Sequence, residues 1–142
     1  MQTPRERGAM TLEAVILVPI FLILMLLIIA GARVGMAGNA INSAASAAAR
    51  EASLSTSTAA AQYNARLAAE TSIANSGYNC ASLNVAINDA GINAPLGQIG
   101  TVSATVTCDV NLQDLTAVPG LPGVRTLEAT ASSPVDAFRE RE

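Results

Sequence analysis

The chain has no histidine and no lysine, and its only aromatic residues are two tyrosines and two phenylalanines. The missing histidine removes the usual general base of serine and cysteine hydrolases and the commonest transition-metal ligand. Without lysine there is no phosphate-binding G-x-x-x-x-G-K motif, and the G-x-S-x-G elbow of hydrolases is absent too. The sequence therefore predicts a protein that is not an enzyme and has no cofactor, no metal and no small-molecule substrate.

Positive charge is scarce and dispersed. The eight basic residues are all arginines that stand singly along the sequence, and the formal net charge is -3. Nucleic-acid binding requires a concentrated basic surface, often with aromatic side chains that stack on bases. We therefore expect no nucleic-acid partner. The acidic residues of the C-terminal half follow no calcium-loop spacing and are interpreted as solvated charges: Asp89, Asp109, Asp114, Glu128 and Asp136.

The chain does have a long apolar run near its N-terminus, AVILVPIFLILMLLIIAGA at positions 14–32. These nineteen uncharged residues form about 28 Å of helix, which is close to the hydrocarbon thickness of a bilayer. Pro19 removes one backbone hydrogen bond and predicts a bend in the helix, not its end. We expect residues 9–33 to form a single transmembrane helix.

The orientation of this helix rests mainly on the two cysteines. Arg5 and Arg7 precede the apolar run and Arg33 follows it, so the positive-inside rule favours a cytoplasmic N-terminus only slightly. Cys80 and Cys108 are separated by 27 residues and fit no metal or redox spacing, so they suggest one disulfide. Such a bridge needs an oxidising compartment, and it would stabilise the domain by about 3 to 4 kcal/mol. Two unpaired buried thiols are the alternative.

The string RERGAMTLEAVILVP, which leads into the apolar run, resembles the processing site of type IV pilin precursors. The wider pattern is Gly8, four residues, Glu13, five residues, Pro19 and then a leucine-rich run. It resembles the TadE-like proteins, which are pilin-related components of tight-adherence (Flp-type) pilus systems, over residues 7 to about 52. The resemblance implies that a prepilin peptidase cuts after Gly8 and makes Ala9 the first residue. It also implies that Glu13 pairs with the N-terminus of a neighbouring subunit.

The resemblance further implies a pilin-like (pseudopilin) subunit of the bacterial cytoplasmic membrane that serves tight-adherence pilus assembly and cell adhesion. Residues 1–8 would be a cytoplasmic leader, and the C-terminal domain would lie outside the cytoplasm or in a surface pilus. The implied partners are the peptidase, other pilin-like subunits, the assembly platform and membrane lipid. Glu13 has an alternative interpretation, in which it lies at headgroup depth in the first helical turn, where the helix dipole favours a negative charge.

Two other functions remain open. An uncleaved single-span protein could scaffold a secretion or pilus machine through its outer domain. Alternatively, Arg5, Arg7, the apolar run and Ala30-Gly31-Ala32 together imitate an ordinary secretory signal, and cleavage after Ala32 would release a secreted binding module. The three possibilities differ in the mature N-terminus.

Residues 34–55 are rich in alanine and glycine and are expected to form a helical stem. Gly31 and Gly35 make a G-x-x-x-G pair, which favours helix packing, although glycine tolerance where a helix leaves the bilayer is an alternative. Beyond the stem, residues 56–133 offer few large apolar side chains, so the core is shallow and would gain from a disulfide or from neighbouring subunits.

This outer part is predicted to be α+β, with a second helix packed on a small antiparallel sheet of about three strands. The helix should be capped between Thr56 and Thr58 and end before Gly77, with apolar positions at Tyr63, Leu67 and Ile73. Residues 88–100 are expected to be a long exposed connection, and residues 134–142 a loose tail. Alternating apolar residues mark three strands, at Leu83, Val85 and Ile87, at Val102, Ala104, Val106, Cys108, Val110 and Leu112, and, after the turn-rich VPGLPG, at Leu127, Ala129 and Ala131.

Overall fold

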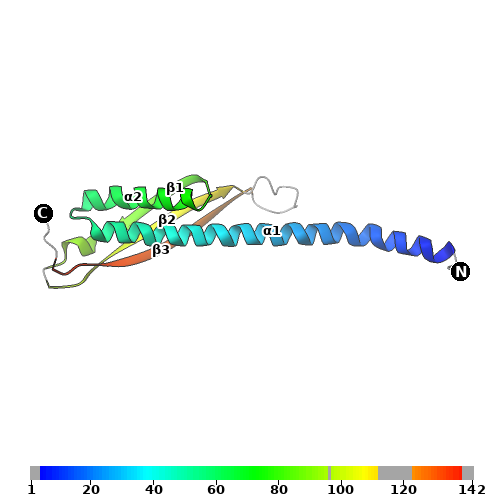
Figure 1. Cartoon of the computed structure of the whole chain (residues 1–142), viewed down its shortest axis with the longest axis horizontal. Coiled ribbons are helices and arrows are strands. Elements are labelled where there is room, and N and C mark those ends of the chain that lie inside the picture. The colour runs from blue at the N-terminus through cyan, green and yellow to red at the C-terminus, as the bar shows by residue number, and fades with distance from the viewer. Residues whose placement is uncertain (1–3, 96, 112–122, 139–142) are drawn as a thin grey trace.

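The computed structural model describes residues 4–95, 97–111 and 123–138, and for residues 4–12 the helical backbone alone. Its three strands form one antiparallel sheet in the order β1, β2, β3. Figure 1 shows α2 and the sheet alongside the C-terminal half of α1, whose N-terminal half projects away from them. The α+β prediction is confirmed. The elements are α1 (Pro4–Leu54), α2 (Thr58–Asn75), β1 (Cys80–Asn88), the 3-10 helix η1 (Ala90–Asn93), β2 (Gly100–Asn111) and β3 (Val124–Val135).

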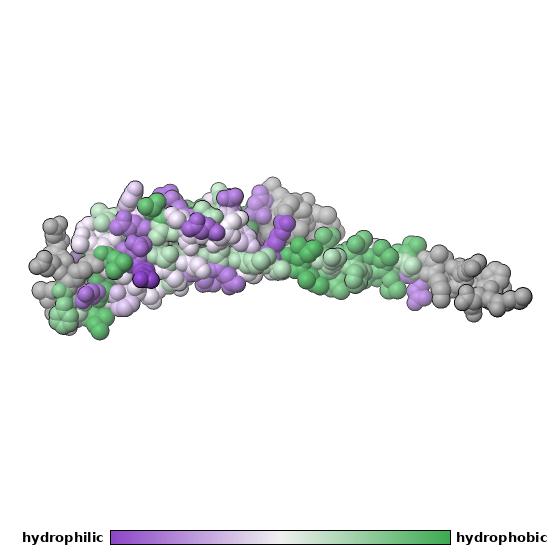
Figure 2. Space-filling model, viewed as in Figure 1, coloured by the Kyte–Doolittle hydropathy of each residue, from purple (hydrophilic) through white to green (hydrophobic). Residues whose placement is uncertain are grey.

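The expected membrane span and the expected stem are one uninterrupted helix. α1 has 51 residues and continues through Pro19. In its N-terminal half the large apolar side chains between Val15 and Ile29 are exposed, apart from the half-buried Leu26. They form the uniformly hydrophobic band in Figure 2. Among the described residues this is the one helix long and apolar enough to cross a membrane.

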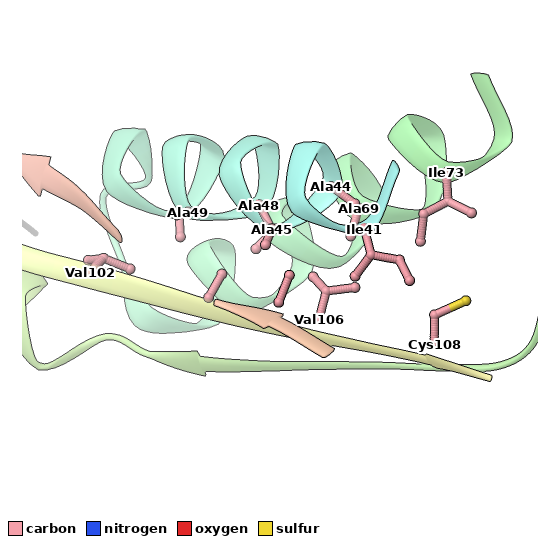
Figure 3. Close-up of a cluster of buried hydrophobic side chains, with 14 of the residues drawn as sticks. Ile41, Ala44, Ala45, Ala48, Ala49, Ala69, Ile73, Val102, Val106 and Cys108 are labelled. Carbon is pink, nitrogen blue, oxygen red and sulfur yellow. The ribbon is translucent and has the colours of Figure 1, made fainter. Parts of the chain in front are cut away.

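The C-terminal half of α1 belongs to the core, where it packs against the sheet and against α2. Its buried face consists almost entirely of alanine and packs against α2, β2 and β3. Methyl side chains let the helix lie close to its neighbours, and the contact with β2 is visible in Figure 3. The stem is therefore built into the outer domain. Its buried residues between Ala37 and Ala52 are Ala37, Ala40, Ile41, Ala44, Ala45, Ala48, Ala49 and Ala52.

The ends of α2 lie where the sequence predicts them. Ser57 is the N-cap, and its hydroxyl accepts a hydrogen bond from the backbone N–H of Ala60 at 3.3 Å. Gly77 follows the helix with a φ of 74°, a left-handed conformation that glycine adopts without steric cost.

The apolar face expected for α2 is wrong at two of its three positions. Tyr63 is 70% exposed and Leu67 is 51% exposed, whereas Ile73 is buried as predicted. The buried residues are spaced four apart, at Ala61, Ala65, Ala69 and Ile73. Alanine occupies most of these buried positions because α2 packs closely against the alanine face of α1. A tyrosine or leucine there would hold the two helices apart.

β2 is the central strand, and the alternation of its side chains is confirmed from Val102 to Val110. Apolar residues of β1 and β3 flank it as predicted, at Leu83, Val85, Ile87, Leu127, Ala129 and Ala131. Leu112 and the turn at VPGLPG, except Gly123, lie outside the described residues. β3 continues through Pro134 to Val135, two residues into the expected tail. β3 is an edge strand, which is where sheets tolerate proline.

The prediction that residues 88–100 form a long exposed connection is also wrong in part, because η1 lies within it and is partly buried in the core. Gly91 and Ile92 are buried there. A Cβ on Gly91 would overlap the backbone of Thr101, and a Cβ on Gly100 would overlap the backbone of Gly91. Two segments thus touch backbone to backbone, which is possible only with glycine at both positions.

Replacing Gly91 with alanine should therefore destabilise the outer domain by about 1 to 3 kcal/mol, the usual cost of overpacking. Thermal unfolding of the full chain in detergent, followed by circular dichroism, measures this. Gly38→Ala is the matched control, because a Cβ there meets nothing within 4 Å and alanine favours helix. A Gly91→Ala melting temperature equal to that of Gly38→Ala would contradict the close contact.

Candidate functional site

The residues predicted to act in processing and assembly all lie on the N-terminal part of α1. Gly8 and Ala9 are in its helical backbone, and Pro19 lies within it. Glu13 lies four residues after Ala9, about 6 Å along the helix axis. The Glu13 side chain is exposed and makes no ion pair with a described residue. Directly after it begins the exposed apolar band, so Glu13 is a lone acid at the edge of a hydrophobic surface.

The glycines after the apolar run leave the surface of α1 open. A Cβ added to Gly31 or Gly35 would meet no atom within 4 Å. Both positions are exposed in the single chain. Another helix could therefore approach the backbone of α1 here, and the packing role of this pair stays a prediction.

The two cysteines form the predicted disulfide. The Sγ atoms of Cys80 and Cys108 are 1.96 Å apart, and the bond joins the first residue of β1 to the core face of β2. Cys108 is buried at 2% exposure. A β-bulge between Cys80 and Leu83 interrupts the regular pairing of the two strands beside the bridge. The covalent link therefore holds the start of β1 where the hydrogen-bonded ladder is irregular.

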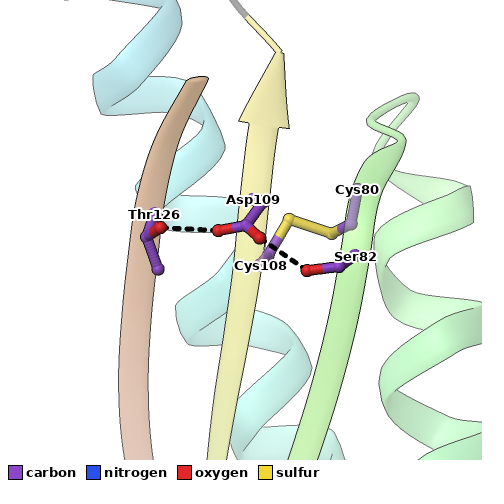
Figure 4. Close-up of a disulfide and its surroundings, with 5 residues drawn as sticks. All are labelled: Cys80, Ser82, Cys108, Asp109 and Thr126. Carbon is purple, nitrogen blue, oxygen red and sulfur yellow. Dashed lines mark hydrogen bonds between the residues drawn. A yellow bond between two sulfur atoms is a disulfide. The ribbon is translucent and has the colours of Figure 1, made fainter. Parts of the chain in front are cut away.

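The sequence predicts Asp109 to be a solvated charge and does not indicate its hydrogen-bonding role in the sheet. Its Oδ2 accepts a hydrogen bond from the hydroxyl of Ser82 on β1, and its Oδ1 accepts one from the hydroxyl of Thr126 on β3, each at 2.6 Å. Figure 4 shows this carboxylate between the outer strands, beside the Cys80–Cys108 bridge. Asp109 thus ties all three strands together on the solvent face. The alternation of β2 indicates that face, but the partners depend on the strand register.

These contacts change the acidity of Asp109. The hydrogen bond from Ser82, followed by that from Thr126, holds the pKa of the Asp109 carboxyl below its ordinary value. Both donors stabilise the charged form. The carboxylate is therefore a structural group that remains ionised at all pH values near neutrality.

We expect this network to weaken in acid. Because the folded pKa of Asp109 is lowered, its contribution to stability is complete above the unfolded value of about 3.9 and is lost as the pH falls through the folded pKa. Asp109→Asn should therefore lower the melting temperature at pH 6, and the difference from wild type should shrink below about pH 4. Glu128→Gln, on the same sheet face, is the control. A difference independent of pH would contradict the charged network.

The described residues offer no cluster of metal-ligating side chains. Within residues 4–95, 97–111 and 123–138, no group of three or more histidine, cysteine, aspartate or glutamate side chains could hold a metal ion. The two cysteines are in the disulfide. What the structure offers instead is a long helix with an exposed apolar half, joined to a cross-linked domain.

Comparison with known proteins bears on this helix alone. The family model described as TadE-like protein matches residues 8–50, which begin at Gly8 and include Glu13 and Pro19. No curated protein and no solved structure matches the chain significantly. The match ends within α1, four residues before Leu54. Residues 8–50 of this chain are thus a TadE-like segment, which confirms the resemblance predicted from the glycine, glutamate and proline pattern.

Proposed function

We propose that this chain is a pilin-like, non-enzymatic membrane subunit that takes part in tight-adherence pilus assembly. The TadE-like match indicates a membrane protein related to tight-adherence pili, and proteins of this kind are generally not enzymes. The observation that carries the proposal is the two-part surface of α1. One half is exposed and apolar, and the other half is the core of the outer domain.

This continuity suits a subunit that moves between a membrane and an assembly. The exposed apolar half, from Val15 to Ile29, must be covered by lipid or by other apolar helices. Because α1 is one helix without a break between its two halves, a displacement of the apolar half carries the outer domain with it. Other pilin-like subunits and the assembly platform would supply the covering helices.

Processing by a prepilin peptidase would place a new N-terminal amine next to the exposed apolar band. A cut after Gly8 leaves Ala9 with a free amine, close to the start of the apolar band. A carboxylate at the edge of hydrocarbon costs about 1 to 3 kcal/mol unless a partner relieves it, and Glu13 would be relieved by the amine of a neighbouring chain. The N-terminus would be cytoplasmic and the outer domain extracytoplasmic, where a disulfide persists.

The mature N-terminus distinguishes this proposal from its alternatives. Intact-mass measurement on protein from native membranes should show loss of residues 1–8 when the prepilin peptidase is present and the full chain when it is deleted. Gly8→Leu should block the cut, and Gly38→Ala, a control glycine in the same helix, should not. A chain that keeps Met1 in assembled surface material would support the scaffold, and one that starts at Arg33 would support the secreted module.

Glu13 is tested separately, in a host that trims the chain. We expect Glu13→Gln to be trimmed normally but to reduce the amount of the chain in sheared surface fractions by about tenfold, since losing an ion pair worth 1 to 3 kcal/mol shifts an equilibrium by that order. Glu128→Gln, an exposed glutamate on β3, is the control. Normal assembly of Glu13→Gln would show that the pairing role is wrong.

A further inference from the structure

A groove of about 690 Å³ runs between α1 and α2. The described residues that line it belong to these two helices and to the C-terminal cap of α2. Its lining includes small, half-buried side chains at Ala47, Ala68 and Ser72. Leu67 also lines it and is 51% exposed. The groove is therefore a place where another helix could approach closely and cover an apolar side chain that the fold itself leaves open.

The side of α1 that borders the groove carries a seam of the kind that pairs helices. Met36, Ser43, Ala47 and Leu54 follow one another at intervals of seven, four and seven residues, so they lie on one line along the helix. Met36 is 53% exposed and Leu54 is 58% exposed. Between these two apolar side chains the seam is small, which would let a second helix come close.

Two opposite charges flank this seam. Arg50 and Glu51 are both exposed, and neither makes an ion pair with a described residue. Since successive residues of a helix are about 100° apart, Arg50 lies about 50° to one side of the line through Ala47 and Leu54. Glu51 lies about 50° to the other side. Charges in these two positions are placed like those that pair across the seam of a coiled coil.

A second copy of the chain fits this charge pattern. Copies that cross one membrane in the same direction have parallel α1 helices, and their outer domains lie at the same height. A two-fold axis along the membrane normal then brings each Arg50 opposite Glu51 of the other chain, because the two flanks of a seam meet crosswise in a parallel pair. The same contact is thus made twice, and it closes after two chains.

Polar side chains in and beside the groove are hydrogen-bonded within the chain. The hydroxyl of Thr71 donates to the backbone carbonyl of Leu67 at 2.8 Å. Nδ2 of Asn64 donates to the hydroxyl of Ser55 at 3.2 Å. These groups keep their hydrogen bonds when another helix covers them, so little free energy is lost on removing them from water.

We propose that two copies of this chain pair in parallel through the seam of α1, with the stem of each lying in the groove of the other. Ala47 lies against its counterpart near the two-fold axis, Leu67 covers α1 of the other chain, and each Arg50 pairs with Glu51 of the other chain. Such pairing would set the spacing and the rotation of two outer domains on the membrane. The inference requires that α1 spans a bilayer, and it depends neither on a cut after Gly8 nor on pilus assembly.

Charge reversal tests the crosswise pairs. The full chain in detergent should form dimers in sedimentation experiments at high ratios of protein to detergent. Arg50→Glu and Glu51→Arg should each lower the dimer affinity about tenfold, because two attractions per dimer become repulsions. The double variant restores opposite charges and should regain most of the affinity. Arg125→Glu, a reversal on β3, is the control and should have no effect. A monomeric wild type, or a double variant no better than the single ones, would overturn the proposal.

Cysteine cross-linking in membranes tests the seam itself. Oxidation should join Ala47→Cys chains to each other and leave Ser46→Cys chains single, because position 46 is the next residue on α1 but lies about 90° from the seam. A melting temperature of Arg50→Glu equal to that of wild type would show that its loss of pairing is not unfolding. Equal cross-linking at both positions would indicate random collision. Cross-linking of Ala47→Cys to a different protein alone would indicate another partner, and either result would overturn the proposal.

Discussion

The close contact between the alanine face of α1 and its neighbours is the constraint on which the rest of the fold depends. α2 and β2 approach the helix at Ala44, Ala45 and Ala48, all of which are completely buried. A methyl group removes little apolar surface from water, so this core gains stability from tight packing more than from buried area. Two further interactions hold the parts of the domain together, the Cys80–Cys108 disulfide and the hydrogen bonds of Asp109.

The disulfide and the Asp109 hydrogen bonds involve neighbouring residues of β2 that lie on opposite faces of the sheet. Cys108 faces the helices and is linked to β1, whereas Asp109 faces solvent and is hydrogen-bonded to β1 and β3. Together they fix the three strands at the end of the sheet where β2 ends. The base of the domain is thus the most cross-linked part of the sheet among the described residues.

The two halves of α1 differ in burial, and their amino-acid composition differs accordingly. Its first half carries large apolar side chains that suit lipid or helix contacts, and its second half carries alanines that suit a compact core. Between them, Gly31 and Gly35 leave the backbone uncovered. The TadE-like match covers this whole transition, from Gly8 to position 50, and stops where the outer domain continues alone. The matched segment therefore includes both the exposed apolar half of α1 and most of its buried alanine face.

The sequence by itself determined the apolar helix, the α+β class, the strand alternation, the caps of α2 and the cysteine pair. Each of these follows from local spacing or composition. Only the tertiary structure decided which face of α2 is buried, because alanine is favoured there by the nearness of α1 and not by its own hydrophobicity. The Gly91 contact and the partners of Asp109 likewise join residues distant in sequence. Their positions depend on strand register and helix approach, which no local pattern encodes.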